Sequence, residues 1–173
     1  QYVSDASLKR IIDDCKGRII SMSLIHESLY RKQDFKEALF SNYIKELLPR
    51  LISTYGADPN KINLSMDIEP IKLSLDDSLP CGLLINEIVS NSLKYAFPDG
   101  ELGNIYISLK QLGEEITLSI ADDGVGLNEG ESYKSEDSFG FLLIDTLASQ
   151  LGAELIINTK NGFSYQIKWA SKA

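Results

Sequence analysis

Three stretches of the sequence carry side chains that suit phosphate chemistry, and the first is NEIVSNSLKYAF at residues 86–97. On a helix with 100° per residue, one face would carry four of its residues: Glu87, Asn91, Lys94 and Tyr95. A carboxylate and a carboxamide one turn apart offer oxygen ligands to Mg²⁺, and Lys94 can meet a phosphate as a point charge. The opposite face would belong to the core: Ile85, Val89, Ser92, Leu93 and Ala96. An ordinary solvated helix face is the alternative interpretation.

The second stretch, ADDGVGL at residues 121–127, places a carboxylate ahead of two glycines. Gly124 and Gly126 allow the backbone to turn tightly and approach a flat ligand. Asp122 can then accept a hydrogen bond from an exocyclic amine, which suits adenine. A simple turn after a strand has the same composition and is the alternative.

The third stretch, DSFGFLLIDTL at residues 137–147, puts Gly140 at the start of a predicted helix. Unpaired N–H groups and the positive end of the helix dipole favour a phosphate there. Taken alone, this third feature is weak evidence for a site.

The elements that position these stretches follow from the apolar periodicity. Spacings of three and four predict helices over 8–29, 34–55, 78–96 and 140–151. Asp34 is the expected cap of the second helix, and the first two helices form a hairpin. Alternation of apolar and polar residues predicts strands over 62–68, 71–75, 105–109, 116–120, 155–157 and 163–169. Turns are expected at Gly113 and at Asn161-Gly162.

This order predicts an α+β protein in which helices cover one side of a mostly antiparallel sheet. The only candidate boundary is the turn GADPN. We therefore predict a helical hairpin over 1–56 and a second unit over 57–173.

Composition excludes several classes of function. The 173 residues carry a net charge of -8, which argues against a nucleic-acid partner, and no apolar run is long enough for a membrane span. Two cysteines without C-x-x-C spacing and a single histidine argue against zinc and suit a reducing cytoplasm. Because the sequence begins at Gln1 and not at Met, we expect it to be a piece of a longer protein.

The three stretches, in this order, resemble the ATP-binding domain shared by histidine kinases, DNA gyrase, Hsp90 chaperones and MutL, the GHKL fold. The stretch with Glu87 and Asn91 matches the N-box, and the stretch with Asp122 matches the D-x-G-x-G box. Gly140 matches the second glycine of a later G-x-G element, where Ser138 replaces the first. The resemblance implies a two-layer α/β sandwich with a mixed, mostly antiparallel sheet, and ATP and Mg²⁺ as ligands.

The resemblance also implies a role for each matching residue. Asn91 would hold Mg²⁺, and Glu87 would be a second metal ligand or a base that aligns the phosphoacceptor. Lys94 would touch a phosphate, and Tyr95 would stack on the adenine base or contact its edge. Asp122 would bind the adenine amine, next to Gly124, Gly126 and Gly140.

The helical hairpin resembles part of the dimerisation domain of a histidine kinase subfamily with a short ATP lid. In that subfamily an H-E-x-L-Y element lies on the second helix of the dimerisation domain. The matching element in this sequence is HESLY at residues 26–30. The phosphoacceptor lies on an upstream helix, as a His followed by Arg or Lys and Asn. His26 is followed by Glu27 and Ser28, so we expect a packing or interface histidine at the edge of the apolar stripe.

The function so implied is that of the catalytic fragment of a two-component sensor histidine kinase. It would pass the γ-phosphoryl of ATP to a histidine upstream of residue 1, form a homodimer through the hairpin, and serve a response regulator in the cytoplasm. One alternative is a serine/threonine kinase of the anti-sigma-factor type. Another is a non-catalytic dimerisation or signalling module with a vestigial ATP pocket.

Overall fold

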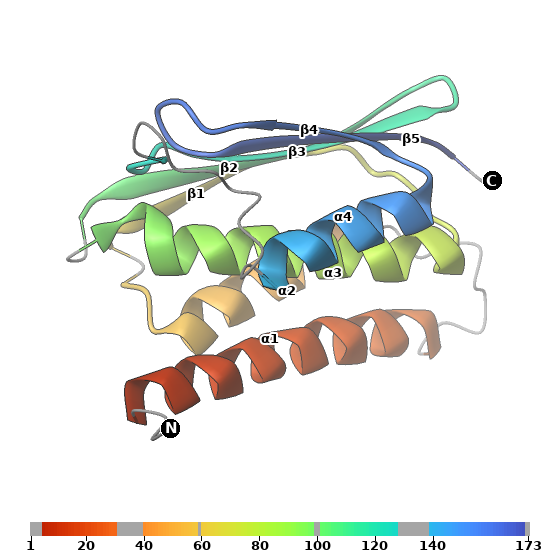
Figure 1. Ribbon diagram of the computed structural model, residues 1–173. Helices are drawn as coiled ribbons and strands as arrows, with labels where there is room; N and C mark the ends of the chain where they lie inside the picture. Colours follow the sequence, from red (N-terminus) through yellow and green to blue (C-terminus); the bar gives the residue numbers. More distant parts are fainter. Residues whose placement is uncertain (1–4, 31–39, 59, 99–100, 128–138, 172–173) are drawn as a thin grey trace.

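The computed structural model describes residues 5–30, 40–58, 60–98, 101–127 and 139–171 (Figure 1). Its helices are α1 (Asp5–Tyr30), α2 (Phe40–Tyr55), α3 (Leu75–Asn91) and α4 (Phe139–Leu151). A short π-helix, η1 (Ser92–Ala96), continues α3. The strands are β1 (Ile62–Ile68), β2 (Gly103–Leu112), β3 (Glu115–Asp122), β4 (Glu154–Asn158) and β5 (Ser164–Ala170).

The strands form one mixed sheet in the order β1-β2-β3-β5-β4. Only β1 and β2 run parallel, and the other neighbours are antiparallel. In Figure 1 the helices lie on one face of this sheet. The predicted α+β class is therefore confirmed, as are the hairpin turns at Gly113 and at Asn161-Gly162, where the glycines have positive φ.

The core lies between the sheet and the helices. Every second residue of β2, β3 and β5 points inward, as at Ile107, Leu118 and Ile167, and all three are fully or almost fully buried. The apolar stripe of α2 enters the same core as α3 and the sheet. Its fully buried apolar side chains are Ile44, Leu47, Leu48 and Leu51. The predicted boundary between residues 56 and 57 remains a prediction.

The strand predicted over 71–75 is wrong. Lys72 forms only an isolated bridge, and α3 begins at Leu75, earlier than the helix predicted from residue 78. Ser74 caps this helix, because its Oγ accepts a hydrogen bond from the N–H of Asp77 at 3.1 Å. The cap and two acidic residues in the first turn stabilise the helix start and outweigh the apolar alternation.

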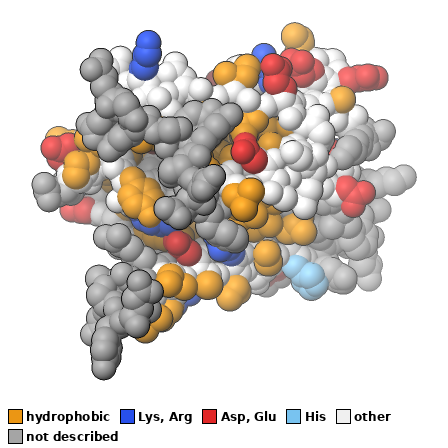
Figure 2. All heavy atoms as spheres, viewed as in Figure 1, with side chains coloured by type: hydrophobic (Ala, Val, Ile, Leu, Met, Phe, Trp, Pro, Cys, Tyr) orange, Lys and Arg blue, Asp and Glu red, His pale blue; other side chains and the backbone are white. Residues whose placement is uncertain are grey.

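Helix α1 is the outermost layer and packs on both α2 and α3. Small residues face the domain, since Gly17 and Ser21 are buried. Large apolar residues face outward and are exposed: Leu8, Ile11, Ile12, Ile19 and Met22. In Figure 2, hydrophobic side chains gather along this helix at the bottom of the view. The predicted cap Asp34 lies outside the described residues. Among the described residues, no helix has the length and apolar character needed to cross a membrane.

Candidate active site

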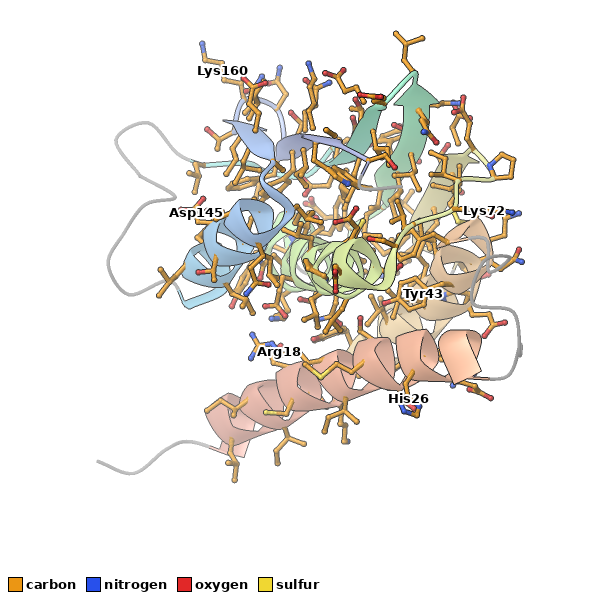
Figure 3. The ribbon with its side chains drawn as sticks, turned by 90° about the vertical axis from the view of Figure 1, so that its right-hand side faces the viewer. Arg18, His26, Tyr43, Lys72, Asp145 and Lys160 are labelled. Atoms are coloured by element: carbon orange, nitrogen blue, oxygen red, sulfur yellow. The ribbon has the colours of Figure 1, made fainter. Side chains whose placement is uncertain are left out.

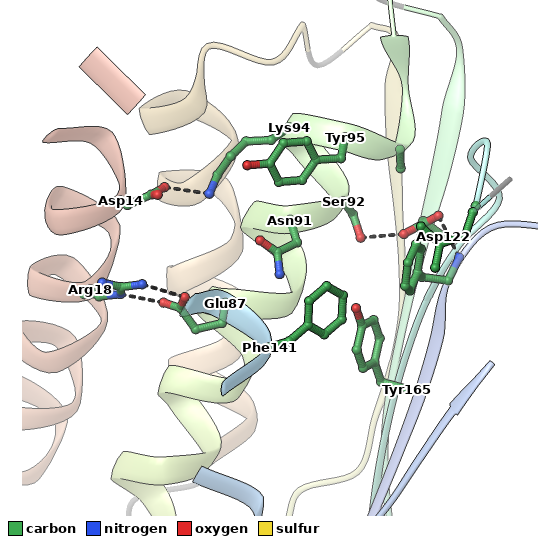
Figure 4. A pocket seen from close by; sticks show the side chains of 15 residues that line it. Asp14, Arg18, Glu87, Asn91, Ser92, Lys94, Tyr95, Asp122, Phe141 and Tyr165 are labelled. Atoms are coloured by element: carbon green, nitrogen blue, oxygen red, sulfur yellow. Dashed lines mark hydrogen bonds and ion pairs between the residues drawn. The ribbon is translucent and has the colours of Figure 1, made fainter. Parts of the chain in front are cut away.

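A cavity of about 550 Å³ opens between α1, α3, η1, α4 and the end of β3. Its lining includes all the residues proposed from the sequence except Gly124: Glu87, Asn91, Lys94, Tyr95, Asp122, Gly126 and Gly140. Figure 4 shows that the cavity extends from Asp122 at one end to Glu87 and Arg18 at the other. The three stretches that are separate in sequence therefore meet in one site.

Asp122 is buried and held by three donors. The hydroxyl of Ser92 donates to its Oδ2 at 2.6 Å. The N–H groups of Gly124 and Phe163 donate to its Oδ1 at 3.2 and 3.1 Å. Donors on both oxygens fix the orientation of the carboxylate, which is only 6% exposed. Such a carboxylate is a pre-oriented acceptor for an amine inside the cavity.

Gly124 explains how the loop after β3 packs so closely on η1. A Cβ on Gly124 would lie 2.3 Å from the carbonyl oxygen of Ala96, so no larger residue fits. The next N–H, of Val125, donates to that same oxygen at 3.0 Å. Gly126 follows with φ +65°, a conformation that favours glycine. Gly124 thus shapes the site without lining it.

Aromatic side chains form a wall that the sequence did not predict. Phe141 of α4, Phe163 and Tyr165 line the cavity beside Asp122. The rings of Phe163 and Tyr165 are stacked with centroids 6.0 Å apart, and Phe141 lies at the same distance from Phe163. Burial raises the pKa of the Tyr165 phenol, with a further contribution from the charge of Asp122. The alternation along β5 was the available signal, since it directs Tyr165 inward.

At the other end of the cavity, Glu87 forms a two-point ion pair with α1. Nε and Nη2 of Arg18 each donate to one carboxylate oxygen of Glu87 at 2.8 Å. The side-chain amide of Asn86 donates to the same carboxylate at 2.9 Å. These hydrogen bonds from Arg18 to Glu87 are the main reason why the pKa of Arg18 is raised. Arg18 was not expected from the sequence, because nothing local connects it with a residue 69 positions away.

Lys94 is also paired with α1. Its ammonium lies 2.7 Å from Oδ1 of Asp14, which also accepts a hydrogen bond from the Tyr55 hydroxyl at 3.2 Å. The ammonium lies 5.3 and 5.7 Å from the ring centroids of Tyr55 and Tyr95. Burial raises the pKa of Tyr55, which keeps its hydroxyl a donor. The ring of Tyr95 itself is largely exposed at the cavity mouth.

His26 lies away from this site. It is exposed, and Figure 3 shows its side chain on the side of α1 that faces away from the domain. It also lies two helical turns beyond Arg18, about 12 Å along the helix axis. His26 is therefore not part of the cavity.

Comparisons with known proteins identify both parts of the chain. Residues 76–172 match the family model described as histidine kinase-, DNA gyrase B- and HSP90-like ATPase. Residues 1–55 match a second model, described as histidine kinase. The ATPase match contains α3, the D-x-G-x-G loop and α4, and so contains every cavity residue outside α1.

Individual relatives agree with these matches. The chain is 27% identical over 148 residues to the sensor histidine kinase PdtaS of Mycobacterium tuberculosis, covering 84% of this chain and 29% of that protein. It is 24% identical over 155 residues to blue-light-activated histidine kinase 2 of Erythrobacter litoralis, covering 87% and 44%. The chain thus spans less than half the length of these relatives.

A solved structure shares the fold. The histidine kinase domain of a blue-light activated histidine kinase from Erythrobacter litoralis superposes with a TM-score of 0.81 at 19% identity, covering 91% of this chain and 75% of that one. The superposition supports the two-layer fold, and the family match implies ATP binding. The chain therefore belongs to the histidine kinase-, DNA gyrase B- and HSP90-like ATPase family.

Proposed function

We propose that the cavity binds ATP with its adenine at Asp122 and its phosphates toward α1, and that the γ-phosphoryl passes to a histidine. The observation that carries this proposal is that the two ends of the cavity have different chemical character. A fixed acceptor and an aromatic wall lie at the Asp122 end, whereas Asn91, Lys94 and Glu87 lie toward the other end (Figure 4). An adenine suits the first end, and a triphosphate suits the second.

Asn91 is the residue that fits a magnesium ion. Its amide faces the cavity next to Gly140, where a Cβ would lie 3.6 Å from the amide oxygen. Mg²⁺ usually keeps several waters and takes only one or two protein ligands together with phosphate oxygens, so one amide oxygen is sufficient. When bound, the ion would neutralise charge on the phosphates. Lys94 would then contact phosphate directly.

In the transfer step, a nitrogen of the acceptor imidazole attacks the γ-phosphorus. A P–N bond forms, the bond between the γ-phosphorus and the bridging oxygen breaks, and ADP leaves with that electron pair. The imidazole loses a proton, and Glu87 is a carboxylate in this end of the cavity that can accept it. Glu87 therefore acts as the base that aligns the acceptor.

The acceptor histidine lies outside residues 1–173 in this proposal. While Asp14 and Arg18 hold α1 at the cavity, His26 lies on the side of this helix that faces away from the domain. We further propose that the full protein forms a homodimer through its helical hairpin and passes the phosphoryl group to a response regulator in the cytoplasm. The match of residues 1–55 to a histidine kinase model favours this function over a serine/threonine kinase.

The test supplies the missing acceptor. The chain is incubated with γ-labelled ATP and Mg²⁺, with and without a dimerisation domain that carries a helix with His followed by Arg or Lys and Asn. We expect label on the supplied domain that is lost in acid, as phosphohistidine is, and none with Asn91→Ala. Acid-stable label would identify a serine/threonine kinase, and no label despite ATP binding would identify a non-catalytic module.

A further inference from the structure

Helix α1 binds the two side chains to which the proposed function gives a role at the phosphate end of the cavity. These are Lys94, which would contact phosphate, and Glu87, which would be the base. Asp14 binds Lys94, and one turn later Arg18 binds Glu87 (Figure 4). The charges are complementary. The anion Asp14 on α1 faces the cation Lys94 on η1. The cation Arg18 on α1 faces the anion Glu87 on α3. The four charges sum to zero, so the phosphate end of the cavity offers no net positive charge while α1 is docked.

The pair between Asp14 and Lys94 puts a carboxylate where a phosphate would bind. The ammonium side chain is 14% exposed and lies 2.7 Å from the carboxylate of Asp14. The Tyr55 hydroxyl donates to the same carboxylate oxygen and holds it in place. A phosphate that approaches Lys94 must therefore displace Asp14 or share its cation.

In the same way, Arg18 occupies the carboxylate of Glu87, which is the proposed base. Both oxygens of Glu87 accept N–H groups of Arg18, and the Glu87 side chain is only 5% exposed. Because a guanidinium holds this carboxylate at two points and Asn86 holds it at a third, its oxygens are already engaged when an imidazole approaches.

A close helix contact makes both pairs possible. Gly17 lies between Asp14 and Arg18 on the inner face of α1, and a Cβ on it would lie 2.9 Å from Oδ1 of Asn86 and from the Tyr55 hydroxyl. A large side chain at this position would meet Asn86 and Tyr55 and push α1 away from the domain. Glycine also lowers helix stability by about 1 kcal/mol relative to alanine, so its place here is explained by packing.

We propose that α1 is an internal competitor for the nucleotide: it docks through Asp14 and Arg18 on Lys94 and Glu87, and binding of the ATP phosphates requires this contact to open. The inference rests on the proposed function of the cavity. Because coupling between two binding events is reciprocal, ATP must also weaken the docking of α1. Adenosine has no phosphates and should bind without affecting α1.

The first experiment measures binding of Mg-ATP and of adenosine by titration calorimetry. Asp14→Asn should tighten ATP binding by up to about fivefold, the value of an ion pair near the protein surface, and leave adenosine binding unchanged. Asp13→Asn is the matched control, because Asp13 pairs with exposed Lys16 away from the cavity and its loss changes the net charge equally. If Asp14→Asn behaves like Asp13→Asn, or weakens ATP binding, the proposal is wrong.

A second variant opens the contact without changing charge. Gly17→Leu should tighten ATP binding in the same direction as Asp14→Asn, with unchanged adenosine binding as evidence of an intact fold. In wild type, hydrogen exchange of the α1 amides should become faster on adding ATP and stay the same on adding adenosine. Slower exchange of α1 with ATP would overturn the proposal. Failure of wild type to bind either ligand would instead refute the proposed function itself.

Discussion

Ser92 has a role at the site that its predicted place did not reveal. It is buried, as expected for the core face, and its hydroxyl donates to Asp122 at 2.6 Å. Its N–H bonds to the carbonyl of Ile88, four residues earlier, so Ser92 still lies on the regular turn of α3. The π-helical segment η1 starts at Ser92, and a π-turn rotates only the side chains that follow it relative to an α-helix. Glu87 and Asn91 precede it, and their shared face was predicted correctly.

Replacing Ser92 by alanine should weaken nucleotide binding. The Asp122 carboxylate would lose one of its three donors and with it part of its fixed orientation. The loss of one hydrogen bond to a charged group is about 1.5–3 kcal/mol, which gives about 10-fold to 150-fold weaker binding as an upper range. Titration of ATP measures the effect. Ser90→Ala is the control, since Ser90 is equally buried on the same helix and bonds to the Glu87 carbonyl; an equal loss there would contradict the role of Ser92.

At the scale of elements, the strands were predictable and the helix ends were less so. Strands β2, β3 and β5 each bury one face, and their apolar residues alternate with polar ones. This period of two therefore predicts both that the segment is a strand and which of its side chains point inward. Residues 71–75 carry the same alternation, but the cap at Ser74 begins a helix there. The contacts of Asp14 and Arg18 could not be predicted, because they depend on how α1 docks and not on any local pattern.

The loop after β3 is the element on which the adenine end depends, and Gly124 tests it. Gly124→Ala places a methyl group 2.3 Å from the Ala96 carbonyl oxygen and 2.5 Å from its Cβ, so the loop must move. We expect ATP affinity to fall at least about fivefold, because overpacking of this kind costs about 1–3 kcal/mol. Gly113→Ala, in the turn between β2 and β3, has nothing within 4 Å and should leave affinity unchanged. Equal effects of the two variants would contradict this account of the loop.

At the scale of the whole molecule, the two faces of α1 have different partners. The inner face carries Asp14, Gly17 and Arg18 against the cavity. The outer face carries an exposed apolar stripe with Ile11 and Ile19, which is the pattern of a helix that packs against another helix. The two contacts can exist at the same time, so the proposed homodimer is compatible with a docked α1.

Charges on the outer face should therefore prevent self-association. The double variant Ile11→Glu and Ile19→Glu removes two apolar side chains from the proposed dimer contact and adds like charges across it. We expect the dimer dissociation constant, measured by sedimentation equilibrium, to rise at least about 100-fold, since burial of each side chain contributes about 1.5–3 kcal/mol. Leu112→Glu changes a more exposed leucine at the end of β2 and is the control. A dimer that persists in the double variant uses another surface.

The central claim is that this cavity binds ATP with the adenine at Asp122, and nucleotide titration of Asp122→Asn tests it most directly. Asparagine has nearly the same shape and can still accept the N–H groups of Gly124 and Phe163, so the loop should stay in place. The account predicts that ATP binding is abolished in Asp122→Asn and retained in Asp123→Asn, since Asp123 is exposed and its carboxylate instead binds Asn104. ATP binding by Asp122→Asn with the affinity of wild type would contradict the account.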